Sequence, residues 1–156
     1  MQGAGWFGLT MLGINLVPAS REMTPVMIAP EPRFARDDRA KNLKAFFDAY
    51  QCPQPRHVEE YIKAADAYGL DYRLLPALSV RESTCGRHAR MNNRWGWDSA
   101  RTGFASVARG IEYVARQLAW GRSYRDKDLD GKLHTYNPNP LYPGEVKRLM
   151  QEIETD

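Results

Sequence analysis

The sequence predicts a mainly α fold with little or no sheet. Apolar side chains recur at three- and four-residue steps in several segments, which is the spacing of one helix face. Helix-ending residues follow these segments, and no run alternates apolar and polar residues as a half-buried strand would. There is no internal repeat, so the 156 residues are predicted to form one folded unit with an N-terminal appendage.

The N-terminal appendage has two parts. Residues 1–19 include an apolar stretch that ends in small residues, as a secretory signal peptide does. No Lys or Arg precedes the stretch, so a non-secretory apolar tail is the alternative, and the stretch is too short for a convincing membrane span. Residues 20–37 contain Pro25, Pro30 and Pro32 and predict an extended linker. We therefore expect an exported protein whose membrane contact is restricted to this N-terminal segment.

Three amphipathic helices are predicted after the linker. The first begins at Asp38 and stops at Cys52-Pro53, and its apolar face consists of Leu43, Phe46, Phe47 and Tyr50. The second ends at Gly69, and its apolar stripe consists of Val58, Tyr61, Ile62, Ala65 and Tyr68. Asp71 is the predicted N-cap of the third, which buries Leu74, Leu75, Leu78 and Val80.

The second half of the chain begins with a predicted loop. Residues 86–103 are rich in Gly, Asn, Arg and Trp, which favours a shaped loop over a helix. A fourth helix is predicted at about 106–120, and shorter helices at about 127–135 and 143–154. The predicted helical domain therefore covers residues 38–154.

The charge pattern bears on possible partners. The net charge of +3 would help the protein to approach an anionic polymer such as a cell wall. Lys and Arg are scattered among Asp and Glu, however, and neither a nucleic-acid motif nor interleaved basic and aromatic residues are present. We expect no nucleic-acid partner.

Glu82 is the residue best placed for acid–base chemistry. It follows Leu78 by four residues and Leu75 by seven, so on a helix it projects from the face of the core leucines. Partial withdrawal from water favours the protonated form of a carboxyl group, which a general acid requires. The alternative is a structural ion pair with Arg81 or Arg87 near the end of the helix.

The surroundings of Glu82 resemble the catalytic region of the lysozyme-like superfamily. The segment Arg81-Glu82-Ser83-Thr84-Cys85-Gly86, followed by Asn92-Asn93-Arg94-Trp95-Gly96-Trp97, is most similar to bacterial endo-β-N-acetylglucosaminidases of the mannosyl-glycoprotein endo-β-N-acetylglucosaminidase type. In that family a helix ends in Glu-Ser-x-x-Gly, and a loop with Asn-x-(aromatic)-Gly crosses the cleft. Residues 136–142 resemble the family's Tyr-Ala-x-Asp-Pro-x-Tyr segment, with Asn137 and Asn139 replacing Ala and Asp. The similarity runs in the same order over about 55–154.

The resemblance implies a lysozyme-like fold that cleaves peptidoglycan strands of N-acetylglucosamine and N-acetylmuramic acid without a cofactor. Glu82 would protonate the leaving glycosidic oxygen, and Tyr136 would line the cleft beside the developing oxocarbenium ion. Trp95 and Trp97 would offer flat surfaces to sugar rings, or else fill the core. The remaining predicted substrate contacts are Ser83, Asn93, Gly96, Asp98 and Asn137. Ser83 could instead finish its helix, and Tyr136 could be a helix-capping core residue.

A second catalytic carboxylate is not evident in the sequence. Asp98 is nearest to the loop, but it could equally cap the next turn. A single Glu suits a glucosaminidase that uses the substrate's own acetamido group, or a lytic transglycosylase that releases a 1,6-anhydro sugar. A non-catalytic wall-binding module is the alternative from another class, and chitin is an alternative substrate.

The cysteines and one acidic segment complete the candidates. Cys52 and Cys85 are the only cysteines, and an even count in an exported protein favours a disulfide. A metal site or thiol–His pair with His57, His88 or His134 lacks the ligand spacing of known motifs. Residues 126–131 match the first half of a calcium loop, but the twelfth position is Asn137 rather than Glu. An Asp-capped helix start is favoured there, and no metal is predicted.

Overall fold

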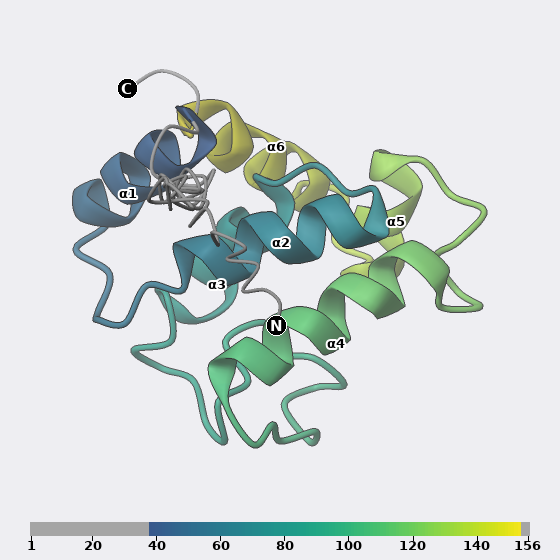
Figure 1. Cartoon of the computed structure of the whole chain (residues 1–156). Helices are drawn as coiled ribbons and strands as arrows, with labels where there is room; N and C mark the ends of the chain where they lie inside the picture. The colour runs from purple at the N-terminus through teal and green to yellow at the C-terminus, as the bar shows by residue number, and fades with distance from the viewer. Residues whose placement is uncertain (1–37, 154–156) are drawn as a thin grey trace, which may run out of the picture. The chain divides into compact units, whose positions relative to one another are not determined.

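The computed structural model describes residues 38–153 and confirms the mainly α fold class (Figure 1). This range contains helices and no strand. The helices are α1 (Asp38–Ala49), α2 (Val58–Tyr68), α3 (Leu74–Ser83), α4 (Val107–Trp120), α5 (Leu129–Tyr136) and α6 (Tyr142–Glu152). The predicted signal peptide or apolar tail and the predicted linker lie outside the described residues. Within 38–153, no helix is long and apolar enough to cross a membrane.

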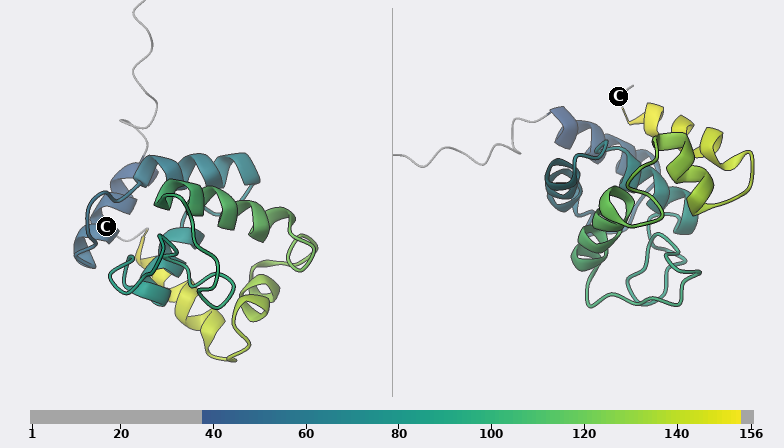
Figure 2. Two further views of the ribbon diagram at one scale, coloured as in Figure 1. Left: turned by 90° about the horizontal axis from the view of Figure 1, so that it is seen from below. Right: turned by 90° about the vertical axis from the view of Figure 1, so that its right-hand side faces the viewer.

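The helices share one hydrophobic core. Helix α2 packs against α1 and α4, and α3 packs against α4 and α6. Helices α2 and α4 lie side by side, and a long connection joins α3 to α4 (Figures 1 and 2). The largest fully buried side chains come from all six helices and from this connection, and they include Phe46, Tyr61, Leu78, Trp95, Ile111, Leu133 and Tyr142. Burial of each such side chain stabilises the fold by about 1.5–3 kcal/mol.

The predicted helix ends are largely confirmed. Gly69 adopts the left-handed conformation after α2, and the Ser106 hydroxyl accepts a hydrogen bond from the backbone N–H of Arg109 at the start of α4. Asp71 behaves differently from the prediction. Its carboxylate accepts a hydrogen bond from the Arg73 backbone N–H at 2.9 Å, while α3 itself begins at Leu74. Asp71 therefore shapes the turn that precedes the helix.

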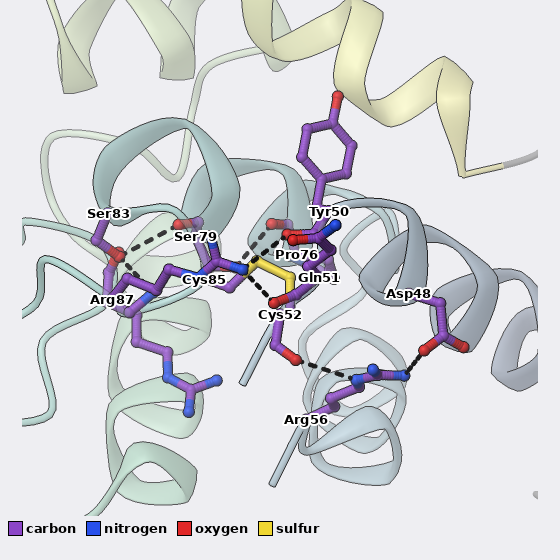
Figure 3. The surroundings of a disulfide bond; sticks show 12 residues. Asp48, Tyr50, Gln51, Cys52, Arg56, Pro76, Ser79, Ser83, Cys85 and Arg87 are labelled. Atoms are coloured by element: carbon purple, nitrogen blue, oxygen red, sulfur yellow. Dashed lines mark hydrogen bonds and ion pairs between the residues drawn. A yellow bond between two sulfur atoms is a disulfide. The ribbon is translucent and has the colours of Figure 1, made fainter. Parts of the chain in front are cut away.

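The predicted disulfide between Cys52 and Cys85 is present (Figure 3). Cys52 lies just beyond α1, and Cys85 lies three residues after Glu82. Arg87 reinforces the connection, because its guanidinium donates to the backbone oxygens of Tyr50 and Gln51. The bridge thus fixes the end of α3, and neither cysteine is available as a metal ligand or a catalytic thiol.

The acidic segment 126–131 starts α5. The Asp128 carboxylate accepts a hydrogen bond from the Gly131 backbone N–H at 2.8 Å, as an N-cap does. Asp126 pairs with Arg125, and Asp130 pairs with Lys147. The three carboxylates serve different partners, and within residues 38–153 no group of three His, Cys, Asp or Glu side chains could hold a metal ion. The Asp-capped helix start is confirmed.

Candidate active site

Glu82 lies in the last turn of α3 and is partly buried. Its Oε1 accepts a hydrogen bond from the Tyr142 hydroxyl at 2.6 Å. A methyl group added to Gly96 would lie 3.4 Å from Oε2, so the loop backbone passes directly beside the carboxylate. Arg81 pairs with Glu145 at 2.7 Å, and among the described residues Glu82 forms no ion pair. The structural ion pair considered for Glu82 is therefore not formed.

Tyr142, the first residue of α6, holds the Glu82 carboxylate. It is 1% exposed, and its ring stacks parallel to that of Tyr136 at 6.0 Å between centroids. The Arg81 guanidinium lies over the Tyr142 ring, 5.7 Å from its centroid. Burial, followed by the hydrogen bond to Glu82, raises the pKa of Tyr142. The hydroxyl therefore stays protonated and donates. Sequence reasoning gave Tyr142 no role, although it closes the 136–142 segment that carries the resemblance.

Ser83 ties the loop to the end of α3. Its hydroxyl lies 2.6 Å from the backbone oxygen of Arg94, to which it donates, and it accepts from the Gly86 backbone N–H at 2.9 Å. Gly86 has φ +95°, and a side chain there would meet the Arg94 side chain at 2.8 Å. Ser83 is buried, so its predicted contact with substrate is corrected to a structural role at the end of the helix.

Asn93 and Trp95 form the inner side of the loop. The Asn93 side chain accepts from the Trp97 backbone N–H and donates to the backbone oxygens of Trp97 and Thr102, all at 2.9 Å. The Trp95 indole N–H donates to the Leu75 backbone oxygen at 3.1 Å. Asn93 is 2% exposed and Trp95 0%. Their predicted substrate contacts are therefore corrected, because buried side chains with satisfied polar groups cannot contact a sugar.

Trp97 lies on the other side of the loop, among tyrosines. It is partly exposed, and its ring centroid is 5.8 Å from those of Tyr124 and Tyr136 and 6.2 Å from that of Tyr113. We call Trp97, Tyr124 and Tyr136 the aromatic face. Tyr113 and Tyr124 belong to no recognised motif, so nothing in the sequence indicated them.

Tyr136 stacks on Tyr142, the residue that binds Glu82, but the Tyr136 hydroxyl has another partner. That hydroxyl donates to the Trp95 backbone oxygen. Burial, followed by the negative charge of Glu82, raises the pKa of Tyr136, so the phenol stays neutral. The ring is partly exposed, whereas the hydroxyl supports the loop. A direct catalytic part for Tyr136 stays a prediction.

Asp98 and Asn137 shape turns. Asp98 is exposed and forms an ion pair with Arg101 at 2.6 Å, and it also accepts a hydrogen bond from the Thr102 hydroxyl. The hydrogen bond from Arg101 lowers the pKa of Asp98. The Asn137 side-chain oxygen accepts from the Asn139 backbone N–H at 3.0 Å. Asp98 therefore fits the turn-capping alternative, and Asn137 uses its carbonyl oxygen locally.

A cavity of about 690 Å³ lies elsewhere, between α1 and the start of α2. Its lining includes Asp48, Arg56, His57 and Glu60, but these side chains already pair, Arg56 with Asp48 and His57 with Glu60. It therefore offers less chemistry than the surroundings of Glu82, which we take as the candidate active site.

No protein-family model, curated protein or solved structure was found to match this chain. Its function is therefore inferred from the side chains around Glu82.

Proposed function

We propose that this protein cleaves a peptidoglycan-type glycan by general acid catalysis from Glu82. The observation that carries the proposal is a partly buried carboxyl group, held by Tyr142 and without an ion pair among the described residues, beside the aromatic face. A glycosidase needs a carboxylic acid at the scissile oxygen, and aromatic rings are suitable surfaces for sugars. The resemblance of residues 81–97 to the lysozyme-like superfamily supports the same reaction.

The hydrogen bond from Tyr142 gives the two oxygens of Glu82 different tasks. Because Oε1 accepts from the Tyr142 hydroxyl, a protonated Glu82 carries its proton on Oε2, the oxygen beside Gly96. In the reaction this proton passes to the glycosidic oxygen while the bond from that oxygen to the anomeric carbon breaks. The Tyr142 hydroxyl then stabilises the carboxylate that remains.

The position of Asp98 favours chemistry with a single enzymic carboxylate. Asp98 is exposed and pairs with Arg101, so it is an unsuitable nucleophile. In the first route, which we favour, the substrate's acetamido oxygen attacks the anomeric carbon, and water then completes hydrolysis to a reducing N-acetylglucosamine end. In the second, the C6 hydroxyl of N-acetylmuramic acid attacks the anomeric carbon instead and gives its proton to the Glu82 carboxylate, so that a 1,6-anhydro sugar results. Neither route requires a second carboxylate.

The test is mass spectrometry of the products that the full chain releases from purified peptidoglycan, with Glu82→Gln as the matched variant. Glutamine keeps the shape but cannot donate the proton, so we expect turnover to fall by about 10²–10⁴-fold. Circular dichroism checks that the variant folds. Reducing N-acetylglucosamine ends would support the first route, and anhydro-muramyl ends the second.

Two results would contradict the proposal. Undiminished turnover by Glu82→Gln would refute the assigned general acid. If the folded wild-type protein released no product that depends on Glu82 but still bound glycan, the protein would be a wall-binding module. Export remains part of the proposal, and the disulfide is compatible with it because such bonds persist in oxidising compartments.

A further inference from the structure

An exposed aromatic pair lies at the ends of the two adjacent helices α2 and α4. Trp120, the last residue of α4, is 62% exposed. Its ring centroid lies 4.8 Å from that of Tyr68, the last residue of α2, with the ring planes at 75°. We call Tyr68 and Trp120 the outer pair. Isolated exposed apolar residues are common, so the significance of this pair depends on how it is held and what adjoins it.

The outer pair is held by contacts to both helices. The Tyr68 hydroxyl donates to the carboxylate of Glu112, two turns before Trp120 on α4. The Lys132 ammonium group donates to the backbone oxygens of Leu118 at 2.7 Å and Tyr124 at 2.6 Å. A cation at a helix C-terminus is favourable. These contacts hold the turn that carries Trp120 at its start and Tyr124 at its end.

This turn connects the outer pair with the aromatic face beside Glu82. Within it, the Tyr124 backbone N–H donates to the Gly121 backbone oxygen at 2.8 Å, so the chain folds back tightly. Four residues span at most about 14 Å even when extended. A glycan chain that leaves the aromatic face at Tyr124 therefore reaches Trp120 within a few sugar rings.

The neighbouring polar groups also suit a sugar. Glu112 is exposed and, as a carboxylate, retains acceptor sites beyond the one that Tyr68 occupies. Arg116, one turn before Trp120, is exposed with its guanidinium over the Tyr113 ring, at 5.7 Å from the centroid. A flat apolar ring bordered by hydrogen-bonding groups matches the alternating faces and hydroxyl edges of a saccharide.

We infer that the outer pair is a second saccharide-binding site, which holds rings of the same glycan away from the bond that is cleaved. The inference rests on the proposed function, because it assigns the same polymer to both places. It predicts that long glycan chains bind more tightly than short ones and that Trp120 is responsible for the difference.

The test is isothermal titration calorimetry of the full chain with peptide-free peptidoglycan fragments, a disaccharide and an octasaccharide. All proteins carry Glu82→Gln, which prevents cleavage during the titration. Trp120→Ala removes one aromatic contact, so the variant should bind the octasaccharide about twofold to tenfold more weakly than its parent does. Its affinity for the disaccharide should not change. Met91→Ala is the control, because Met91 is also apolar and 56% exposed but lies in the loop before α4.

The possible failures are distinguishable. If Trp120→Ala binds the octasaccharide as tightly as its parent does, the outer pair is not a saccharide site. The proposed function would still stand in that case, because the parent binds the glycan. If the parent binds neither fragment, both proposals fail. Sedimentation that shows a dimer dependent on Trp120 would overturn the inference by assigning the pair to self-association. Thermal unfolding confirms that each variant is folded.

Discussion

The two tryptophans of the loop between α3 and α4 are separated by one residue and lie in opposite environments. Trp95 is 0% exposed, and its ring packs against α4 so closely that a methyl group on Gly110 would lie 2.6 Å from it. Trp97 is partly exposed among the tyrosines of the aromatic face. The inner side of the loop is thus part of the core, while the outer side borders the candidate active site.

The difference shows how an irregular loop can be rigid enough to carry a site. Between the two rings, Gly96 adopts φ +59°, and Asn93 binds the backbone of Trp97 on both its N–H and its oxygen. These bonds replace the regular ladder of a helix or strand, and a satisfied buried amide has only one good arrangement. The inner residues therefore determine where the outer ones lie.

The largest expected effects are on stability and glycan binding, and they differ between the two tryptophans. Trp95→Ala should lower the free energy of unfolding by about 3–5 kcal/mol, because it empties a fully buried site. Trp97→Ala should cost about 1–2 kcal/mol, since the ring is partly exposed, but should weaken glycan binding strongly. Urea denaturation and calorimetry with the octasaccharide measure the two quantities. Equal losses of stability in both variants would contradict the division into inner and outer sides.

Reduction of the disulfide tests a different support of the same loop. Cys52 and Cys85 are 33 residues apart, and closure of a loop of that length stabilises a fold by about 3–4 kcal/mol. We expect Cys52→Ala/Cys85→Ala to lower the free energy of unfolding by this amount. Amide hydrogen exchange should accelerate near Cys85 more than near Trp95, which has its own anchors. Uniform acceleration over the loop would show that Trp95 depends on the bridge.

The helices could be predicted from the sequence better than the site could. Regular spacing determines which helix face is buried, so the buried stripes of α1 and α2 are found where expected. The start of α4 near residue 106 and the Asp-capped start of α5 are also found where expected. The residue types around Glu82 could also be recognised. In an irregular loop, however, no period says which way a side chain points. The sequence therefore could not exclude Asn93 as a substrate contact or decide between a sugar contact and a core position for Trp95, and both side chains are buried. Tyr124 reaches the site through tertiary packing alone.

A smaller effect on catalysis is expected in the candidate active site, from loss of the Tyr142 hydroxyl. Tyr142→Phe keeps the stacked ring but removes the hydrogen bond to Glu82. A hydrogen bond to a charged group contributes about 1.5–3 kcal/mol, so kcat should fall roughly tenfold to a hundredfold, with KM little changed. Steady-state kinetics on peptidoglycan measure both constants. An unchanged kcat would reduce Tyr142 to a packing residue.

The smallest effect, on stability, is expected from the matching change in the core beside Trp95, which is Tyr61→Phe. The Tyr61 ring packs edge-on against Trp95 at 6.2 Å, and within residues 38–153 its buried hydroxyl has no hydrogen-bond partner. Because an unsatisfied buried hydroxyl is unfavourable, its removal should leave stability at pH 7 unchanged or raise it by up to about 1 kcal/mol.

The stability of the protein at alkaline pH gives a second test of the buried Tyr61 hydroxyl. Burial raises the pKa of Tyr61 to about 12, whereas in the unfolded chain the pKa is about 10. Below pH 10 both states are protonated and stability is unaffected; between pH 10 and 12 the unfolded state ionises first, so stability falls. Tyr61→Phe should reduce that fall without abolishing it, because the pKa of Tyr50 is also raised to about 12. Identical alkaline unfolding curves for the two proteins would mean that Tyr61 is more accessible to water than its place against Trp95 implies.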